Sequence, residues 1–220
     1  MNRIITKPLP YRQFNAVFWL IGINILIFAA TRLFGDNVRI IMTKILCMIP
    51  DLVLHGWVWS FVTYMFMHAD IYHLLFNMFG LFIFGIQVER QMGSSEFLLY
   101  YFVTGTLAGI LSFGIYVITG SPKITLLGAS GAIFAVQLAY AVMFPNSIIY
   151  IWGLIPVRAA VMVLGFTALE LFFSIFSRKT GINRRYNVAH LTHLAGFAFG
   201  WLYFMARFRI NPWRRLTNRG

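Results

Sequence analysis

The stretch GASGAIFAVQLAYAVMFP, residues 128–145, is apolar yet too short to cross a bilayer as one helix. A helix that begins at Ser130 and ends at the Phe144-Pro145 break has about fifteen residues, or roughly 22 Å at 1.5 Å per residue. The hydrocarbon core of a bilayer is about 30 Å thick. We therefore expect this helix to begin below the membrane surface, with Ser130 at its tip.

The rest of the chain has the composition of a membrane protein. Of its 220 residues, 60% are hydrophobic and 18% are aromatic, and the mean hydropathy is +0.75. A soluble core of ordinary size cannot bury that much apolar surface. With about 20 residues needed for each span, the sequence predicts an all-α membrane protein with six transmembrane helices, at 14–34, 70–87, 95–118, 129–145, 156–177 and 186–207.

The basic residues are placed as expected for contact with lipid headgroups. The net charge is +12, but Lys and Arg gather in short clusters between the apolar stretches, which favours a bilayer over nucleic acid as the partner. Six spans put both termini on one side, and a small excess of basic residues places that side in the cytoplasm. We expect one helical domain, 14–207, between an N-terminal tail, 1–13, and a basic C-terminal tail, 208–220.

The segment between the first two spans, 36–60, is long and mixed in polarity. Trp57 and Trp59 suit an amphipathic loop that rests at the membrane interface, so we expect it to be partly embedded. A single cysteine, Cys47, excludes an internal disulfide and a cysteine-rich metal site.

Polar side chains inside the spans are costly to bury and therefore mark candidate functional residues. The second, fourth and sixth spans run in the same direction, and His73, Ser130 and His193 each lie near the start of one, so all three share a leaflet. His193 lies about seven residues into its span, roughly 10 Å deep. A serine hydroxyl attacks well only when an imidazole removes its proton, and the matching depths permit that pairing. The full set is His68, His73, Asn77, Ser130, Glu170, His190 and His193.

Small residues predict that the fourth and sixth helices pack closely. Gly131 and Ala135 lie on one face of the fourth helix, and Gly196 and Gly200 form a GxxxG pair on the sixth. His193 shares the face of that pair. The packing surface would therefore also present the imidazole to the fourth helix.

Acyl transfer also requires donors for the oxyanion of the tetrahedral intermediate. His73 and Asn77, spaced i and i+4, can point toward one site. The backbone N–H of Ser130, at a helix start, could add a further donor.

Three segments together resemble the signature motifs of rhomboid intramembrane serine proteases: HADIYHLLFN at 68–77, GASGAIFA at 128–135 and AHLTHLAGFAFG at 189–200. The resemblance implies a six-helix rhomboid bundle in a bacterial cytoplasmic membrane that cleaves transmembrane segments of membrane proteins. It implies a nucleophile and a general base that form a Ser-His dyad, two residues that stabilise the oxyanion, and no metal or other cofactor. By resemblance, Ser130 is the nucleophile, His193 is the general base and acid, and His73 and Asn77 stabilise the oxyanion. The resemblance also implies supporting positions at Gly128, Gly131, Phe134, Gly196 and Gly200.

Some positions and functions stay open at this stage. His193 is selected over His190 because the family's catalytic histidine precedes two glycines by three and seven residues; we expect His190 and His68 to be structural. Glu170 could be the third member of a triad, but the resemblance assigns none, so a dyad is favoured. One alternative is a metal-dependent protease whose ligands would be His68, His73, His190 and His193, although the sequence has no HExxH motif. The others are a catalytically silent rhomboid-like protein that binds membrane clients and a small transporter. Substrate and oligomeric state are not predicted.

Overall fold

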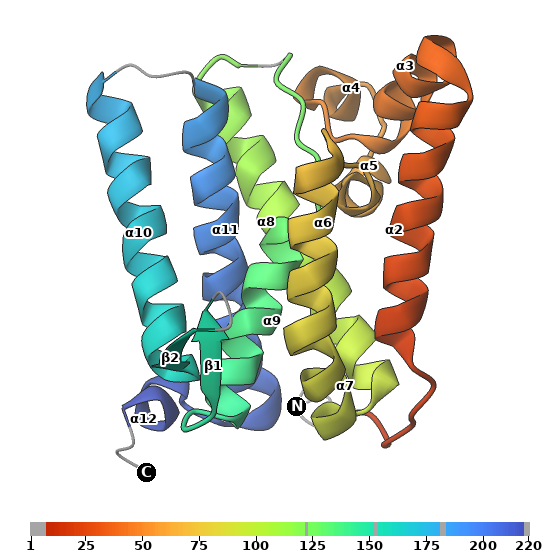
Figure 1. Ribbon diagram of the computed structural model, residues 1–220. Helices are drawn as coiled ribbons and strands as arrows, with labels where there is room; N and C mark the ends of the chain where they lie inside the picture. Colours follow the sequence, from red (N-terminus) through yellow and green to blue (C-terminus); the bar gives the residue numbers. More distant parts are fainter. Residues whose placement is uncertain (1–7, 122, 152–153, 181–183, 218–220) are drawn as a thin grey trace.

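The computed structural model describes residues 8–121, 123–151, 154–180 and 184–217, and most of these residues are helical (Figure 1). A helical segment occupies each of the six predicted ranges. In chain order these are α2 (Ala16–Leu33), α6 (Ile71–Gly80) continued by a π-helical turn (Leu81–Gly85) and α7 (Ile86–Met92), α8 (Ser94–Ile118), α9 (Ser130–Met143), α10 (Ala159–Thr180), and α11 (Arg184–Tyr203) with a π-helical extension (Phe204–Phe208).

The helices differ in whether they can cross a bilayer on their own. By length and composition, α2, the α6–α7 segment (Ile71–Met92) and α8 are long and apolar enough. By contrast, α9 and the apolar part of α10 (Ala159–Ile175) are shorter. The prediction of a helical protein with membrane-crossing helices is therefore confirmed, and the count of six spans stays a prediction.

The segment after α2 is more helical than the sequence suggested. It contains α3 (Gly35–Leu46), α4 (Pro50–Leu54), α5 (Ser60–Thr63) and a 3-10 turn (Tyr64–Phe66), gathered at the upper end of the bundle in Figure 1. No residue of α3 is buried, and Ile40, Ile41 and Ile45 are exposed. The indole N–H of Trp59 donates to the carbonyl of Ile45 at 3.0 Å, which ties α3 to α5. An interfacial position stays a prediction.

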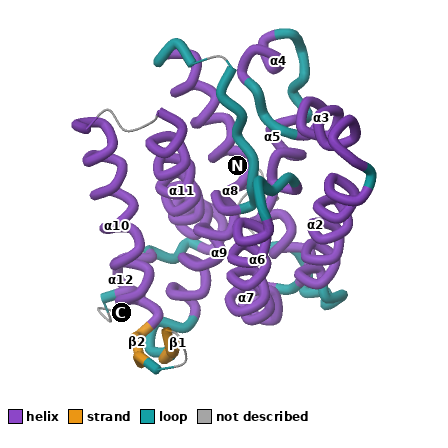
Figure 2. Tube along the Cα trace, turned by 45° about the horizontal axis from the view of Figure 1, so that its top comes forward, coloured by secondary structure: helices purple, strands orange, loops and turns teal. Residues whose placement is uncertain are grey.

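A short hairpin replaces the start of the predicted fifth span. Strands β1 (Ile148–Ile151) and β2 (Ile155–Arg158) pair antiparallel, with Ile148 opposite Arg158, at the end of the bundle away from α3–α5 (Figure 2). The prediction that helix begins at 156 was wrong, because α10 begins at Ala159. Short apolar runs fit strand and helix equally well by periodicity, so the sequence does not separate the two here.

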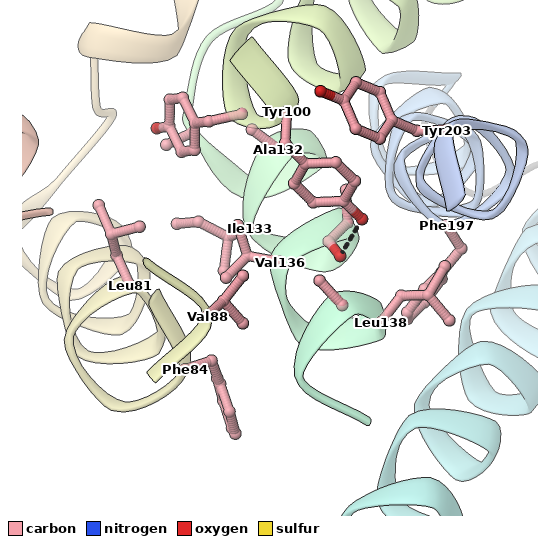
Figure 3. Close-up of a cluster of buried hydrophobic side chains, with 14 of the residues drawn as sticks. Leu81, Phe84, Val88, Tyr100, Ala132, Ile133, Val136, Leu138, Phe197 and Tyr203 are labelled. Atoms are coloured by element: carbon pink, nitrogen blue, oxygen red, sulfur yellow. Dashed lines mark hydrogen bonds between the residues drawn. The ribbon is translucent and has the colours of Figure 1, made fainter. Parts of the chain in front are cut away.

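Helix α9 lies at the centre of the bundle, and α8, α11 and the α6–α7 segment pack around it (Figure 1). Its small side chains let these neighbours approach, and larger residues from the other helices fill the remaining space (Figure 3). The buried hydroxyl of Tyr100 donates to the carbonyl of Ala135 at 2.6 Å, drawn as a dashed line in Figure 3. Backbone contact between α8 and α9 is therefore reinforced by a side-chain hydrogen bond.

A buried carboxylate fastens both ends of the chain to one end of the bundle. Glu96, in the first turn of α8, accepts from the backbone N–H of Leu9 at 2.7 Å and from the Tyr203 hydroxyl at 2.6 Å. Its other close partner is Arg207, whose Nη2 lies 2.8 Å away. Residues before α2 and after α11 thus meet at the same end. The short helix α12 (Pro212–Leu216) follows there.

Candidate active site

The chain reaches Ser130 by descending into the bundle in extended form. Met48 and Leu126 exchange two backbone hydrogen bonds, at 3.1 and 2.9 Å. Two residues later the N–H of Gly128 donates to the carbonyl of Tyr64 at 3.0 Å. Helix α9 then begins at Ser130, well below the upper ends of its neighbours in Figure 1. The expected placement of Ser130 at the tip of a short, recessed helix matches this geometry.

Ser130 and His193 lie within hydrogen-bonding distance. The Nε2 atom of His193, on α11, is 2.8 Å from the Oγ atom of Ser130. The His193 ring stacks on Phe134, one helical turn after Ser130, with ring centroids 4.3 Å apart and planes 7° apart. Because Phe134 shares a helix with Ser130, the stack fixes the imidazole relative to the hydroxyl.

Contact between the backbones of α9 and α11 brings these two residues together. A Cβ atom on Gly196 would overlap the carbonyl of Gly131, and one on Gly200 would lie 3.2 Å from the Cβ of Ala135. The hydroxyls of Thr192 and Ser112 are 2.6 Å apart and join α11 to α8. The glycine pairs that the sequence placed at a helix contact do lie there.

His73 lies against the loop that leads to Ser130. A Cβ atom on Gly128 would be 2.7 Å from the Cε1 and Nε2 atoms of His73, and Gly128 has a φ of +110°. Only glycine satisfies both the close approach and the backbone angle. His73 Nε2 is thus next to the peptide that precedes the tip of α9.

Asn77 lies at the level of Ser130. A Cβ on Gly80 would be 3.1 Å from Ile133 Cγ2, so these two residues lie side by side. Asn77 comes three residues before Gly80, and Ser130 comes three residues before Ile133. Because the two helices run in the same direction, Asn77 and Ser130 lie at one level. The side chain of Asn77 is buried and donates one hydrogen bond to the carbonyl of His73 at 2.7 Å. An amide has two donor hydrogens, so this contact uses one.

His68 precedes α6 and packs edge-on against His73, with ring centroids 5.1 Å apart. Burial, together with the neighbouring His73, lowers the pKa of His68 to about 4 from an ordinary value of 6.5. The imidazole of His68 is therefore neutral at physiological pH. The structural role expected for His68 stays a prediction.

The sequence reading left Glu170 without an assigned role, and the structure places it on the far side of His193 from Ser130. Its Oε1 atom is 3.1 Å from His193 Nδ1, and its Oε2 atom is 2.6 Å from His190 Nδ1. Glu170 comes from the middle of α10, and both histidines come from α11. A chain of contacts thus runs from Ser130 through His193 to Glu170 and on to His190.

The family model described as the Rhomboid domain matches residues 55–210, which include every residue of this cluster. The chain belongs to the rhomboid family. The rhomboid protein YdcA of Bacillus subtilis (strain 168) is 34% identical over 152 residues, covering 68% of this chain and 67% of YdcA.

In two other relatives, the matched region is a smaller share of the relative's own length. RHOMBOID-like protein 12, mitochondrial, of Arabidopsis thaliana is 30% identical over 198 residues, covering 84% of this rhomboid chain and 56% of the relative. Rhomboid protease GluP of Bacillus subtilis (strain 168) is 41% identical over 84 residues, covering 38% of this chain and 15% of GluP. The rhomboid chain thus spans about half to two thirds of the first two relatives' length.

One group in the rhomboid chain has donors of the kind that bind transition metals. Single ligand atoms of Glu170, His190 and His193 all lie within 4.8 Å of one another, and imidazole and carboxylate both bind zinc. The metal-dependent alternative had instead named His68, His73, His190 and His193. Among the described residues, the group that could bind a metal contains Glu170 together with His190 and His193, and it does not include His68 or His73.

Proposed function

We propose that the protein is an intramembrane serine endopeptidase that cleaves transmembrane segments of other membrane proteins by means of Ser130 and His193. The observation that carries the proposal is the 2.8 Å approach of His193 Nε2 to Ser130 Oγ at the recessed tip of α9. Membership of the rhomboid family, in which relatives are named as proteases, supports it.

The reaction follows from this geometry. His193 Nε2 takes the proton from Ser130 Oγ as the oxygen attacks the scissile carbonyl carbon, which forms a C–O bond and an oxyanion. Collapse of the intermediate breaks the C–N bond, and the imidazolium gives its proton to the leaving amine. Water then attacks the acyl-enzyme through the same base, releasing the new carboxyl end and restoring the serine.

Donors for the oxyanion come from the side of α6 and from the start of α9. His73 lies beside Gly128, Asn77 has a second amide hydrogen besides the one that it donates to the carbonyl of His73, and the backbone N–H of Ser130 lies at the start of α9. Donors fixed in advance at a developing charge give large rate effects, about 10²–10³ in kcat for one donor. We assign the oxyanion site to these three groups.

The substrate must unwind before it is cut. Peptide carbonyls in a helix are hydrogen-bonded, and exposing one to hydrocarbon costs several kcal/mol. We therefore infer that substrates carry helix-weakening residues near the cleavage site. In this proposal six spans, within the domain 14–207, lie in a bacterial cytoplasmic membrane with both tails, 1–13 and 208–220, in the cytoplasm.

The test uses purified protein in detergent with a panel of transmembrane reporter peptides. Wild type is compared with Ser130→Ala and His193→Ala, with and without a metal chelator. We expect cleavage by wild type in both conditions and none by either variant. Cleavage that survives Ser130→Ala contradicts the mechanism. Absence of cleavage and of fluorophosphonate labelling in the wild type indicates a client-binding protein without activity.

A further inference from the structure

We propose that Glu170 is a positioning residue that holds His193 in the tautomer and orientation needed by Ser130, so that the site works as a Ser-His-Glu triad rather than a dyad. This inference rests on the proposed protease function. It concerns a carboxylate on α10, a helix that contributes no other residue to the proposed catalytic group.

The two nitrogens of His193 face different partners. Nε2 is 2.8 Å from Ser130 Oγ, and Nδ1 is 3.1 Å from Glu170 Oε1. To accept the serine proton, Nε2 must carry a lone pair, so the ring proton must be on Nδ1. A carboxylate accepts hydrogen bonds and cannot donate when ionised. Glu170 therefore favours the one tautomer in which Nε2 is a base.

The surroundings make this contact strong. The side chain of Glu170 is 15% exposed and that of His193 is 19% exposed, and hydrogen bonds are electrostatically stronger in such surroundings than in water. When His193 takes the serine proton, a positive charge forms on the ring beside the carboxylate. Glu170 would then stabilise the charge that develops during the reaction.

His190 fixes the carboxylate in turn. Its Nδ1 atom is 2.6 Å from Glu170 Oε2, the oxygen that does not face His193. The His190 ring lies against Phe173, with centroids 5.7 Å apart and planes 21° apart. With one oxygen held by His190, the other keeps its direction toward His193. We assign His190 this supporting role.

Glu170, His190 and His193 could instead bind a metal ion. A metal site and a triad differ in whether His193 Nδ1 carries a proton. A metal bound by His193 Nδ1 requires that atom to be unprotonated. The triad requires a proton on the same atom. Direct observation of the His193 tautomer therefore separates them.

The first measurement needs only the wild type. Protein labelled with ¹⁵N-histidine in detergent is examined by NMR at neutral pH, and His193 is assigned by comparison with His193→Gln. We expect a protonated Nδ1 and an unprotonated Nε2. A proton on Nε2, or an equal mixture of tautomers, overturns the proposal whatever the behaviour of any variant.

The second measurement compares Glu170→Gln with Thr167→Val, which removes a polar group one turn away on α10 that bonds its own helix at Val163. Glutamine has nearly the shape of glutamate but presents an amide that can donate to Nδ1 and reverse the tautomer. Replacing the carboxylate by an amide in a serine protease triad lowers kcat by roughly 10⁴. We expect kcat to fall at least about 100-fold, with KM unchanged and His193 shifted toward the Nε2–H form.

Three outcomes bear on the proposal separately. If Glu170→Gln cleaves the reporter within about twofold of wild type, Glu170 has no positioning role. If a chelator abolishes wild-type cleavage and Zn²⁺ restores it, the group is a metal site and the triad is wrong. If the wild type and Thr167→Val both neither cleave nor react with a fluorophosphonate, the proposed protease function fails, which differs from selective loss in Glu170→Gln.

Discussion

Glu96 and Glu170 are carboxylates within the helical bundle that have different kinds of partner. Glu96 is bound by an arginine, a tyrosine hydroxyl and a backbone N–H, all of which donate. Glu170 is in contact with two imidazole nitrogens, and an imidazole nitrogen can either donate or accept a hydrogen bond, depending on where the ring proton lies. A carboxylate with permanent donors fastens chain segments, whereas one beside a base in contact with a hydroxyl can take part in proton transfer. The partners, rather than the carboxylate, separate the two roles.

The largest effect expected is at the reacting end of the Glu170 cluster. Ser130→Ala removes the attacking oxygen, so reporter cleavage should fall at least about 10³-fold, with little change in melting temperature because the hydroxyl is not part of the core packing. Cleavage assays and thermal unfolding in the same detergent check both parts. Retained activity, or a large fall in melting temperature, would remove the contrast with Glu96.

The Glu96 cluster should show the opposite behaviour. Glu96→Gln removes the negative charge from the buried pair that Glu96 forms with Arg207, and breaking a buried pair costs about 3–5 kcal/mol. The free energy of unfolding, measured by titration with SDS in mixed micelles, should fall by that order, and the folded fraction should keep its kcat. A smaller stability loss than in Glu170→Gln would reverse the comparison.

A substitution at the backbone contact between α9 and α11 should lower both the free energy of unfolding and kcat. Gly196→Ala places a Cβ against the carbonyl of Gly131, so α11 must shift, at a cost of about 1–3 kcal/mol, and move His193 from Ser130. Both stability and kcat should fall.

The matched control is Gly165→Ala on α10, where a Cβ meets nothing within 4 Å. That change should stabilise the helix by roughly 0.4–1 kcal/mol. Equal effects of the two substitutions would show that helix propensity, and not the contact between α9 and α11, decides.

The smallest effect concerns pH and the packing of His68. The folded protein holds His68 neutral with a pKa of about 4, below the ordinary value of 6.5, so the unfolded chain binds more protons between these values. Stability should therefore be full above about pH 6.5 and decline as the pH falls toward 4. Thermal unfolding across this range should show a smaller slope for His68→Phe than for the wild type.

Much of the fold could be read from composition and spacing, because a bilayer requires long apolar helices and leaves few other options. The ranges of α2, α8 and α9 were predicted to within a few residues for this reason. The helices of 36–60 and the strand before α10 were missed. The strand lies in a short apolar run whose periodicity fits strand and helix equally well. In α3, by contrast, Val38, Ile41, Met42, Ile45 and Leu46 follow a helical period, a signal that the prediction of an amphipathic loop did not use.

In the candidate site, the meeting of Ser130 and His193 followed from depth and from glycine spacing. Glu170 could have been placed by the same arithmetic. Glu170 lies seven residues before the end of the predicted fifth span, 156–177, and His193 lies seven residues after the start of the sixth, 186–207. Two antiparallel helices therefore hold both residues at one depth. What the sequence could not provide is rotation about the helix axes, which decides whether side chains at equal depth face one another.

The paired backbone hydrogen bonds of Met48 and Leu126 affect how the protein could tolerate insertions. Because Leu126 and Gly128 are both anchored to the segment before α6, extra residues inserted between Thr119 and Ile124 would enlarge the surface loop without lowering Ser130. Under the proposed protease function, the position of the cut along a substrate would then depend on the anchored segment rather than on loop length. Evolution could vary that loop freely while the depth of cleavage stayed constant.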